Sequence, residues 1–212
     1  TLNSIQDMYV VNEQDIWTCL INGFIFYTTD GGNQWTESNP NIISSNKTNG
    51  IYANAEGHVW ATGKFVSILH SSDLATTWTD QIPNSKSIMY QPNFLNEEEG
   101  LVGGSAGTIL WTKNGGASWD KIQLGEDENF FAVDILNSQM AVGGSSSGRV
   151  FATANGGQDW QIIGDNLGQI VDIHAALNEV GVVYASTDTH AGWDLGDKCK
   201  PLKHPPRGFD DK

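Results

Sequence analysis

The chain has 212 residues, a formal net charge of −14 at pH 7, 24 glycines and eight tryptophans. Such an acidic chain repels nucleic acid and anionic membranes, and no apolar run is long enough to insert into a membrane. The glycine and tryptophan content favours a β-rich domain over a helical bundle.

Along the chain, five segments rich in β-branched and aromatic residues predict the first strand of a repeated unit. They are DMYVV (7–11), GIYANA (50–55), SIMYQ (87–91), FFAVDI (130–135) and IVDIHA (170–175). Two further apolar runs separated by Gly, Asn or Ser follow in the first four units, over residues 17–30, 60–73, 101–114 and 142–155. Each pair of runs predicts a hairpin.

A tryptophan motif closes each hairpin. Its five copies are TTDGGNQW ending at Trp35, SSDLATTW at Trp78, TKNGGASW at Trp119, TANGGQDW at Trp160 and a looser STDTHAGW at Trp193. Short stretches such as DKIQL (120–124) and QIIG (161–164) follow and predict a fourth strand. The tryptophans are 43, 41, 41 and 33 residues apart, which is typical of four-stranded propeller blades, the last one shortened.

We therefore predict an all-β fold, a β-propeller of about five four-stranded blades over residues 1–194, on its own or as part of a larger ring. Strands such as residues 24–27, which are apolar on both faces, fit blades covered by their neighbours. Three of the six prolines and five of the eleven basic residues lie from residue 198 on. We expect residues 195–212 to form an extended Pro/Lys-rich tail, either a latch or a partner-binding arm.

The tryptophan motif resembles the Asp-box, or bacterial neuraminidase repeat. Its acidic position is filled by Asp30, Asp73 and Asp188, and by amides at Asn114 and Asn155. In this turn, between the third and fourth strands, the Asp or Asn side chain accepts backbone N–H groups and glycine takes a positive φ. The amides favour a structural staple over a ring of catalytic or metal-binding carboxylates, so we expect no metal and no cofactor.

Cys19 and Cys199 lie 180 positions apart, which excludes a CxxC redox or zinc motif. A disulfide between them would tie the first blade to the tail, whereas the alternative makes Cys19 a small core residue. A chain that opens at Thr1 and carries a sequon at Asn46 is expected of a secreted, periplasmic or lumenal protein.

Families with the Asp-box include sialidases, xyloglucan-cleaving glycosidases, sortilin-type receptors and photosystem II stability and assembly factors. The units around VGGSAGTILWTKNGGASW and VGGSSSGRVFATANGGQDW are most similar to the last family. That resemblance implies an extracytoplasmic propeller that holds other proteins, using the rim opposite the boxes. The arginine-rich patch attributed to that family has no counterpart in this sequence.

A sialidase is disfavoured because that family uses three arginines, and this chain has only Arg149 and Arg207. Asp134 and Asp172 are expected to occupy similar places on the first strands of the fourth and fifth units, near the channel. They are candidates for a glycosidase pair, with His174 two residues beyond Asp172. Tyr9, Tyr52 and Tyr90 could stack on sugars, as in a lectin.

The leading interpretation is a non-enzymatic interaction or scaffold propeller with protein partners, as a subunit or assembly factor of a larger complex. The alternative is a carbohydrate-engaging propeller, either a glycoside hydrolase or a lectin. The acidic runs Glu97–Glu99 and Glu126–Glu128 either steer a basic partner or are solvated loops.

Overall fold

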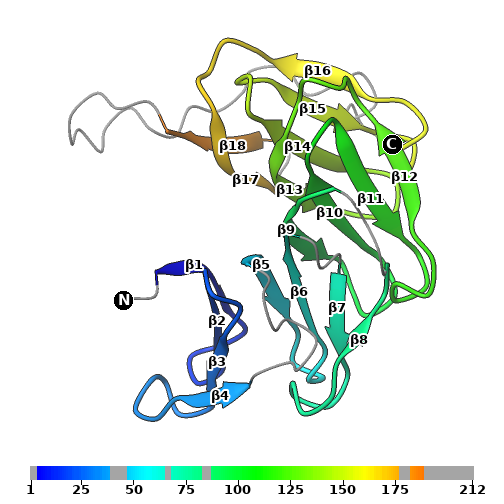
Figure 1. Ribbon diagram of the computed structural model, residues 1–212. Coiled ribbons are helices and arrows are strands. Elements are labelled where there is room, and N and C mark those ends of the chain that lie inside the picture. The colour runs from blue at the N-terminus through cyan, green and yellow to red at the C-terminus, as the bar shows by residue number, and fades with distance from the viewer. Residues whose placement is uncertain (1–3, 39–46, 65–67, 83–86, 177–181, 189–212) are drawn as a thin grey trace. The chain divides into compact units, whose positions relative to one another are not determined.

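The computed structural model describes residues 4–38, 47–64, 68–82, 87–176 and 182–188, and its regular elements in these ranges are all strands (Figure 1). The predicted tail, Trp193 and Cys199 lie outside the described residues. The chain divides into two compact units, Thr1–Pro92 with Asn114–Ser118, and Asn93–Lys113 with Trp119–Lys212. Each unit is described by itself.

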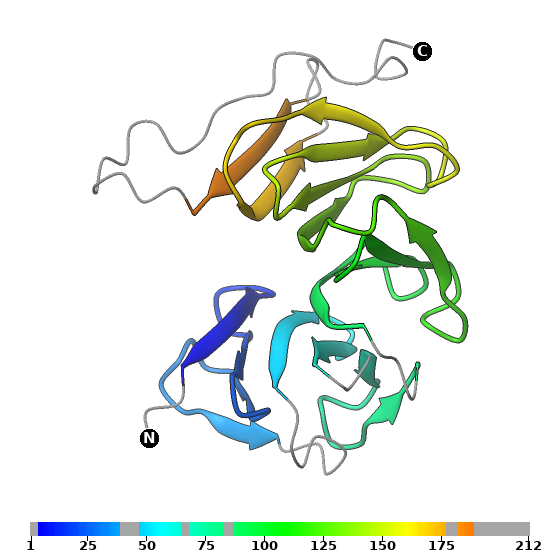
Figure 2. The ribbon, with the colours of Figure 1, turned by 45° about the horizontal axis from the view of Figure 1, so that its top comes forward.

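The first unit contains two four-stranded antiparallel sheets, seen in blue and cyan in Figure 2. We call them blades 1 and 2, because each consists of four strands consecutive in the chain. Blade 1 comprises β1 (Ile5–Val10), β2 (Ile16–Leu20), β3 (Ile25–Thr28) and β4 (Thr36–Ser38). Blade 2 comprises β5 (Thr48–Ala53), β6 (Val59–Gly63), β7 (Ile68–Ser71) and β8 (Thr79–Asp80).

The remaining strands continue the pattern, with the boundary between the units running through β9. Blade 3 comprises β9 (Met89–Phe94), β10 (Gly100–Gly104), β11 (Thr108–Thr112) and β12 (Asp120–Gln123). Blade 4 comprises β13 (Phe130–Ile135), β14 (Ala141–Ser145), β15 (Val150–Thr153) and β16 (Gln161–Gly164). Blade 5 shows two described strands, β17 (Ile170–Ala176) and β18 (Val182–Thr187).

The first strands of blades 1, 2, 4 and 5 share one irregularity, a register shift after their opening residue. This bulge fixes which residues of different blades are equivalent, because pairing with the second strand resumes two residues later. Tyr9, Tyr52, Asp134 and His174 stand opposite Trp17, Trp60, Val142 and Tyr184 and are therefore equivalent to one another.

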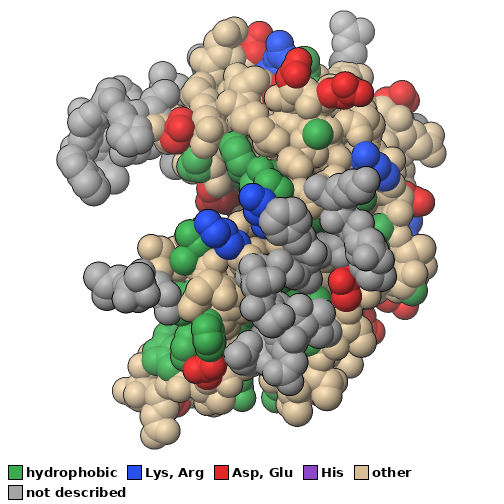
Figure 3. Space-filling view, in the orientation of Figure 1, with side chains coloured by type: hydrophobic (Ala, Val, Ile, Leu, Met, Phe, Trp, Pro, Cys, Tyr) green, Lys and Arg blue, Asp and Glu red, His purple; other side chains and the backbone are tan. Residues whose placement is uncertain are grey.

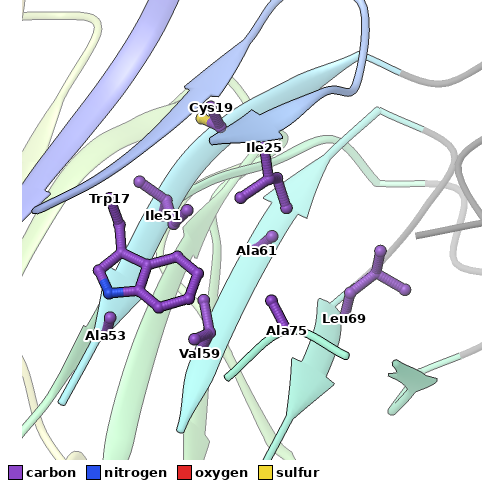
Figure 4. Close-up of a cluster of buried hydrophobic side chains, with 9 residues drawn as sticks. All are labelled: Trp17, Cys19, Ile25, Ile51, Ala53, Val59, Ala61, Leu69 and Ala75. Atoms are coloured by element: carbon purple, nitrogen blue, oxygen red, sulfur yellow. The ribbon is translucent and has the colours of Figure 1, made fainter. Parts of the chain in front are cut away.

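Buried apolar residues come from both faces of the strands, as the all-apolar runs predict. In the first unit, Trp17, Cys19 and Ile25 of blade 1 share a cluster with Ile51 and Ala53 of β5 (Figure 4). In the second unit, one cluster joins blade 3 to blade 4 and another joins blade 4 to blade 5. Each blade thus contributes side chains to a core that it shares with its neighbour in the chain, and the prediction of stacked blades is confirmed.

Candidate functional site

The first Asp-box turn lies between β3 and β4, where the sequence places it. The hydroxyl of Thr28 is buried and donates to Oδ1 of Asp30 at 2.7 Å. The same hydroxyl accepts the N–H of Gly32 at 3.0 Å, and Asp30 Oδ1 accepts the N–H of Gln34 at 2.9 Å. Gly32 adopts a φ of +92°, which a glycine tolerates without strain.

The next three boxes repeat this network. Their acidic or amide oxygen accepts a backbone N–H four residues on, at 2.8–2.9 Å, in the pairs Asp73–Thr77, Asn114–Ser118 and Asn155–Asp159. Hydrogen bonds from the backbone and from the neighbouring hydroxyls hold the pKa of Asp73 at about 2. Because Asn makes the same bond as Asp, the staple requires an acceptor and not a charge.

The box tryptophans pack at the corners of the blades. Trp78 belongs to the core of the first unit, and its Nε1 lies 3.3 Å from Ser38 Oγ and 3.2 Å from the carbonyl of Ala75. In the second unit, Trp160 packs against the cluster between blades 3 and 4, and Trp119 contacts Phe94 edge to face. Trp35, by contrast, is 44% exposed.

The prediction of a fifth box at Asp188 is wrong in position. Asp188 follows β18, which pairs with β17 and is therefore the second strand of its blade, not the third. Its N–H donates to the carbonyl of Gln169, as the N–H of Ser146 after the second strand of blade 4 donates to Asn129. The motif at Asp188 therefore follows the second strand of its blade, whereas the other four boxes follow the third strand.

Asp134, the first candidate for a catalytic pair, holds two strands together. Its buried Oδ2 accepts the N–H of Ala175 at 2.8 Å and lies 3.2 Å from Nδ1 of the exposed His174. Burial raises the pKa of Asp134, and the hydrogen bond from Ala175 opposes this shift. In blade 3, Asn93 makes the same type of contact to the N–H of Ile135 at 3.3 Å, so the bond needs no carboxylate.

Asp172 does not occupy the position equivalent to Asp134, contrary to the sequence interpretation. It stands opposite Ser186, as Asp7 stands opposite Cys19, and the equivalent of Asp134 is His174. Its exposed carboxylate accepts the N–H of Ile173 at 2.9 Å. The charge of Asp172 contributes to the raised pKa of Asp134, so the two carboxylates are electrostatic neighbours, although they are not equivalent.

The three tyrosines proposed to stack on sugars do not form an equivalent set. Tyr9 and Tyr52 are equivalent and their rings lie 4.5 Å apart, but Tyr52 is buried, also contacting Trp60. Burial raises the pKa of Tyr52. Tyr90 falls three residues before Asn93, the position that matches Tyr9 in blade 3, and so points from another place on its strand.

Two glutamates that the sequence placed in acidic surface runs are structural. Glu99 is buried and accepts hydrogen bonds from Trp111 Nε1 at 3.1 Å and Ser138 Oγ at 2.5 Å. Glu128 is buried and binds Arg149 at 2.9 Å and Ser147 at 2.8 Å. Hydrogen bonds and the nearby guanidinium lower the pKa of Glu128 although burial opposes them. The sequence of an acidic run does not show which of its side chains is buried.

Within the described ranges, no three His, Cys, Asp or Glu side chains come close enough to hold a metal ion. His58 and His70 are paired through Nδ1 and Nε2 at 3.0 Å, and burial and the proximity of His58 lower the pKa of His70 to about 4.

In the part of the chain that the structure describes, no helix is long and apolar enough to cross a membrane.

Cys19 is buried in β2 beneath the first strand of blade 2, and burial raises the pKa of its thiol to about 12. This buried environment fits the alternative in which Cys19 is a small core residue. Its proposed disulfide partner Cys199 lies outside the described residues, so the disulfide stays a prediction.

Comparison with known proteins agrees with this architecture. Two solved structures are similar at the level of the fold: YCF48 bound to D1 peptide, and YCF48 from Cyanidioschyzon merolae. Their TM-scores are 0.67 and 0.65, with 18% and 15% sequence identity over 88% and 94% of this chain. The chain spans 61% of the first and 72% of the second. An ancestral GH74 enzyme has a TM-score of 0.67 and 15% identity over 90% of this chain, which covers 30% of that enzyme.

No curated protein matches the sequence. The sequence profile of the family described as "Photosynthesis system II assembly factor YCF48" matches residues 51–198, which is more than half of the chain. The resemblance noted from the repeat units is confirmed, and the chain belongs to the YCF48 family of photosynthesis system II assembly factors.

Proposed function

We propose that the chain is a non-enzymatic, protein-binding propeller that holds a segment of a partner protein, as an assembly factor or subunit of a larger complex. The observation that carries the proposal is the family match over residues 51–198. A related structure, YCF48, is bound to a D1 peptide. We further propose an extracytoplasmic compartment, such as an organelle lumen, for this activity.

The roles of the conspicuous polar residues support a binding protein over an enzyme. Asp30, Asp73 and Asp134 accept backbone N–H groups, and an asparagine replaces the aspartate at equivalent positions. A general acid or nucleophile would need its carboxylate available to a substrate. The likeness to GH74 enzymes concerns the fold and carries no argument for hydrolysis.

The partner segment is proposed to be basic and to contact the rim opposite the Asp-boxes. In antiparallel blades, the turn between strands one and two lies at the same end as the box, and the connection to the next blade lies at the other end. Exposed Glu126 and Asp127 belong to such a connection, between β12 and β13. Acidic side chains lie scattered among neutral ones in Figure 3, and the chain as a whole is strongly negative. An experiment must therefore distinguish binding at this rim from attraction of a basic peptide to the overall charge.

The experiment is a titration of the intact chain with a fluorescent D1 peptide and with a lysine-rich peptide, each compared with a scrambled or charge-reversed control. We expect saturable binding that weakens as salt rises from 50 to 300 mM, by roughly tenfold for an electrostatically steered contact. Absence of saturable binding to both peptides would count against the proposal.

Two matched variants locate the contact. Glu126→Gln/Asp127→Asn removes two exposed charges from the proposed rim, and Glu97→Gln/Glu98→Gln removes two from the turn at the box end of the same unit. We expect the first pair to weaken binding more than the second. Equal effects would indicate general charge attraction, and binding of a xyloglucan oligosaccharide in place of peptide would favour the carbohydrate alternative.

A further inference from the structure

Four asparagines in the sequence precede a glycine, namely Asn22, Asn49, Asn114 and Asn155. Such a pair can change its own covalent structure, because glycine has no Cβ to shield its backbone nitrogen from the asparagine side chain. All four pairs lie in the described ranges of the chain, and their surroundings differ.

The reaction is a deamidation in two steps. The backbone nitrogen of the glycine attacks Cγ of the asparagine, the bond from Cγ to Nδ2 breaks, and the proton of the attacking nitrogen leaves with Nδ2 as ammonia. Water then opens the cyclic imide at one of its two carbonyl carbons, which gives either aspartate or isoaspartate. The asparagine side chain must rotate toward the glycine nitrogen, so hydrogen bonds that fix the side chain slow the reaction.

Asn49 is fixed within strand β5. Its Nδ2 donates to the carbonyl of Met89 at 2.8 Å. The glycine that follows is closely packed, because a Cβ at Gly50 would overlap the carbonyl oxygen of Tyr90. The side chain and the backbone of this pair are therefore both held in place.

The two box asparagines are held at both ends of their amide groups. Asn114 Oδ1 accepts the N–H of Ser118, and its Nδ2 donates to Ser118 Oγ, both at 2.9 Å. Asn155 makes the corresponding bonds to the N–H and to Oδ2 of Asp159, also at 2.9 Å. Rotation of either side chain breaks two hydrogen bonds, so the box that these residues stabilise also protects them.

Asn22 is exposed in the turn between β2 and β3. The N–H of Gly23 donates to the carbonyl of Leu20, and the N–H of Leu20 donates to the carbonyl of Phe24, both at 2.9 Å. These bonds and the φ of +91° at Gly23 define a three-residue hairpin loop. Among the described residues, the Asn22 side chain makes one hydrogen bond, which it accepts from the N–H of Phe24 at a long 3.4 Å.

We propose that Asn22 is a site of spontaneous deamidation in the folded chain, and that the fold protects the other three Asn-Gly pairs. In an antiparallel blade, the turn after the second strand lies at the end opposite the turn after the third. The reaction therefore adds a negative charge to the rim opposite the Asp-boxes as the protein ages. The proposal does not depend on the proposed function.

The two products have different consequences for blade 1. Aspartate keeps an oxygen for the N–H of Phe24 and is common in turns. Isoaspartate adds a main-chain carbon to a hairpin whose flanking residues, Cys19 and Ile25, are paired and buried. We therefore expect the isoaspartate form to unfold at a lower urea concentration than the aspartate form.

The test is incubation of the intact chain at mildly alkaline pH, followed by peptide mapping with mass spectrometry. We expect a gain of about 1 Da at Asn22, divided between two products of equal mass. Each of the other three pairs should react at least about tenfold more slowly, which corresponds to about 1.4 kcal/mol of activation free energy. In urea, where no fold protects them, all four should react at similar rates.

Two variants test the assignment. Asn22→Ser removes the reacting amide and should abolish the main product, while urea unfolding shows that the hairpin is retained. Serine suits this turn because Ser147 occupies the same place in the β14–β15 loop, where the N–H of Gly148 donates to Ser145. Ser118→Ala removes the acceptor of Asn114 Nδ2 and should speed deamidation of Asn114 by about two- to tenfold, leaving Asn22 unchanged.

Three results would overturn the proposal. One is an Asn22 that stays unmodified in the folded chain, whether or not it reacts in urea. Another is equal rates at the four pairs of the folded chain, which would show that the fold makes no distinction. The third is faster reaction at Asn49, Asn114 or Asn155 than at Asn22.

Discussion

The hydroxyl of Thr28 and the carboxylate of Asp30 are joined by a 2.7 Å hydrogen bond, and the two side chains together bind the backbone of the turn that follows. The sequence motif emphasises the acid, but the buried hydroxyl makes as many contacts. The hydroxyl-bearing residue at this position is buried in all four described boxes, as Thr28, Ser71, Thr112 and Thr153.

Thr28→Val should therefore destabilise the chain by about 1–3 kcal/mol, because it removes a buried hydroxyl and leaves the N–H of Gly32 without its acceptor. Urea unfolding measures the change. Thr36→Val on the exposed strand β4 is the control and should change the free energy of unfolding by less than about 0.5 kcal/mol. Equal losses in the two variants would contradict the proposed role of the hydroxyl.

The second box is strained where the first is not. Leu74 and Ala75 adopt φ values of +53° and +60°, in the region that glycine occupies in box 1. A left-handed conformation costs a non-glycine residue about 1–2 kcal/mol, partly offset by the greater chain entropy of glycine. We expect Leu74→Gly, at an exposed position, to raise the free energy of unfolding by up to about 1 kcal/mol.

The reciprocal change in box 1 is Gly32→Ala, which should lower the free energy of unfolding by about 1–2 kcal/mol because φ at Gly32 is +92°. Thermal and urea unfolding of both variants provide the comparison. Loss of stability in Leu74→Gly would show that the contact of the Leu74 side chain with Gly57 outweighs the backbone strain.

Acid should weaken the fold through Asp73. Its pKa of about 2 in the folded chain lies below its ordinary value of 3.8, so the stabilisation is complete above pH 3.8 and is lost as pH falls through 2. Asp73→Asn should flatten the pH dependence of the urea midpoint in that window. Asp120→Asn, on an exposed strand, controls for the change in net charge, and an equal flattening there would contradict the assignment to Asp73.

Asp134 offers a test that separates a structural acceptor from a catalytic acid. Asp134→Asn keeps an oxygen for the N–H of Ala175 and removes the cost of burying a charge, so stability at pH 7 should be retained or raised. Asp134→Ala leaves that N–H without its acceptor and should cost about 1–3 kcal/mol. Urea unfolding distinguishes the two, and equal losses would indicate that the charge itself is required.

Cys19 should resist alkylation at pH 8 in the folded chain, because its thiol is buried and its pKa is raised to about 12. If the disulfide with Cys199 exists, unfolding without reductant leaves Cys19 unlabelled, and labelling requires reduction. Mass spectrometry of the labelled peptide gives the answer. Labelling after unfolding alone would exclude the disulfide.

The order of strands was predictable because each unit repeats short-range signals: a first strand, a hairpin and a tryptophan-bearing turn. The sequence was less informative about which positions within the strands are equivalent from one blade to the next. The first strands of blades 1, 4 and 5 carry the same bulge, and Asp172 stands two residues after the start of its strand, as Asp7 does, whereas Asp134 stands four residues after the start of its strand. Asp172 therefore corresponds to Asp7 and not to Asp134. The motif at Asp188 has the hydroxyl, the acid and the tryptophan at the spacing of an Asp-box, but the strand that precedes it is the second of its blade and not the third.

The contacts of the polar side chains depend on neighbours that are distant in the sequence. Glu99 meets Ser138, and Asp134 meets Ala175, 39 and 41 residues away. Inspection of one repeat at a time cannot show such pairs. The signal that could have revealed them is the exchange of Asp134 for Asn93 at one repeat position, since both side chains supply an acceptor oxygen.

In three pairs of successive blades, a backbone N–H on the first strand of one blade donates to a side-chain oxygen on the first strand of the blade that precedes it. One repeat of about 41 residues therefore carries both the side-chain acceptor and the backbone donor of this contact. A tandem copy inserted in frame would present both groups to its neighbours in the correct orientation. Such a gene can lengthen or shorten by whole repeats without inventing a new junction, and members of the family could differ in blade number for this reason.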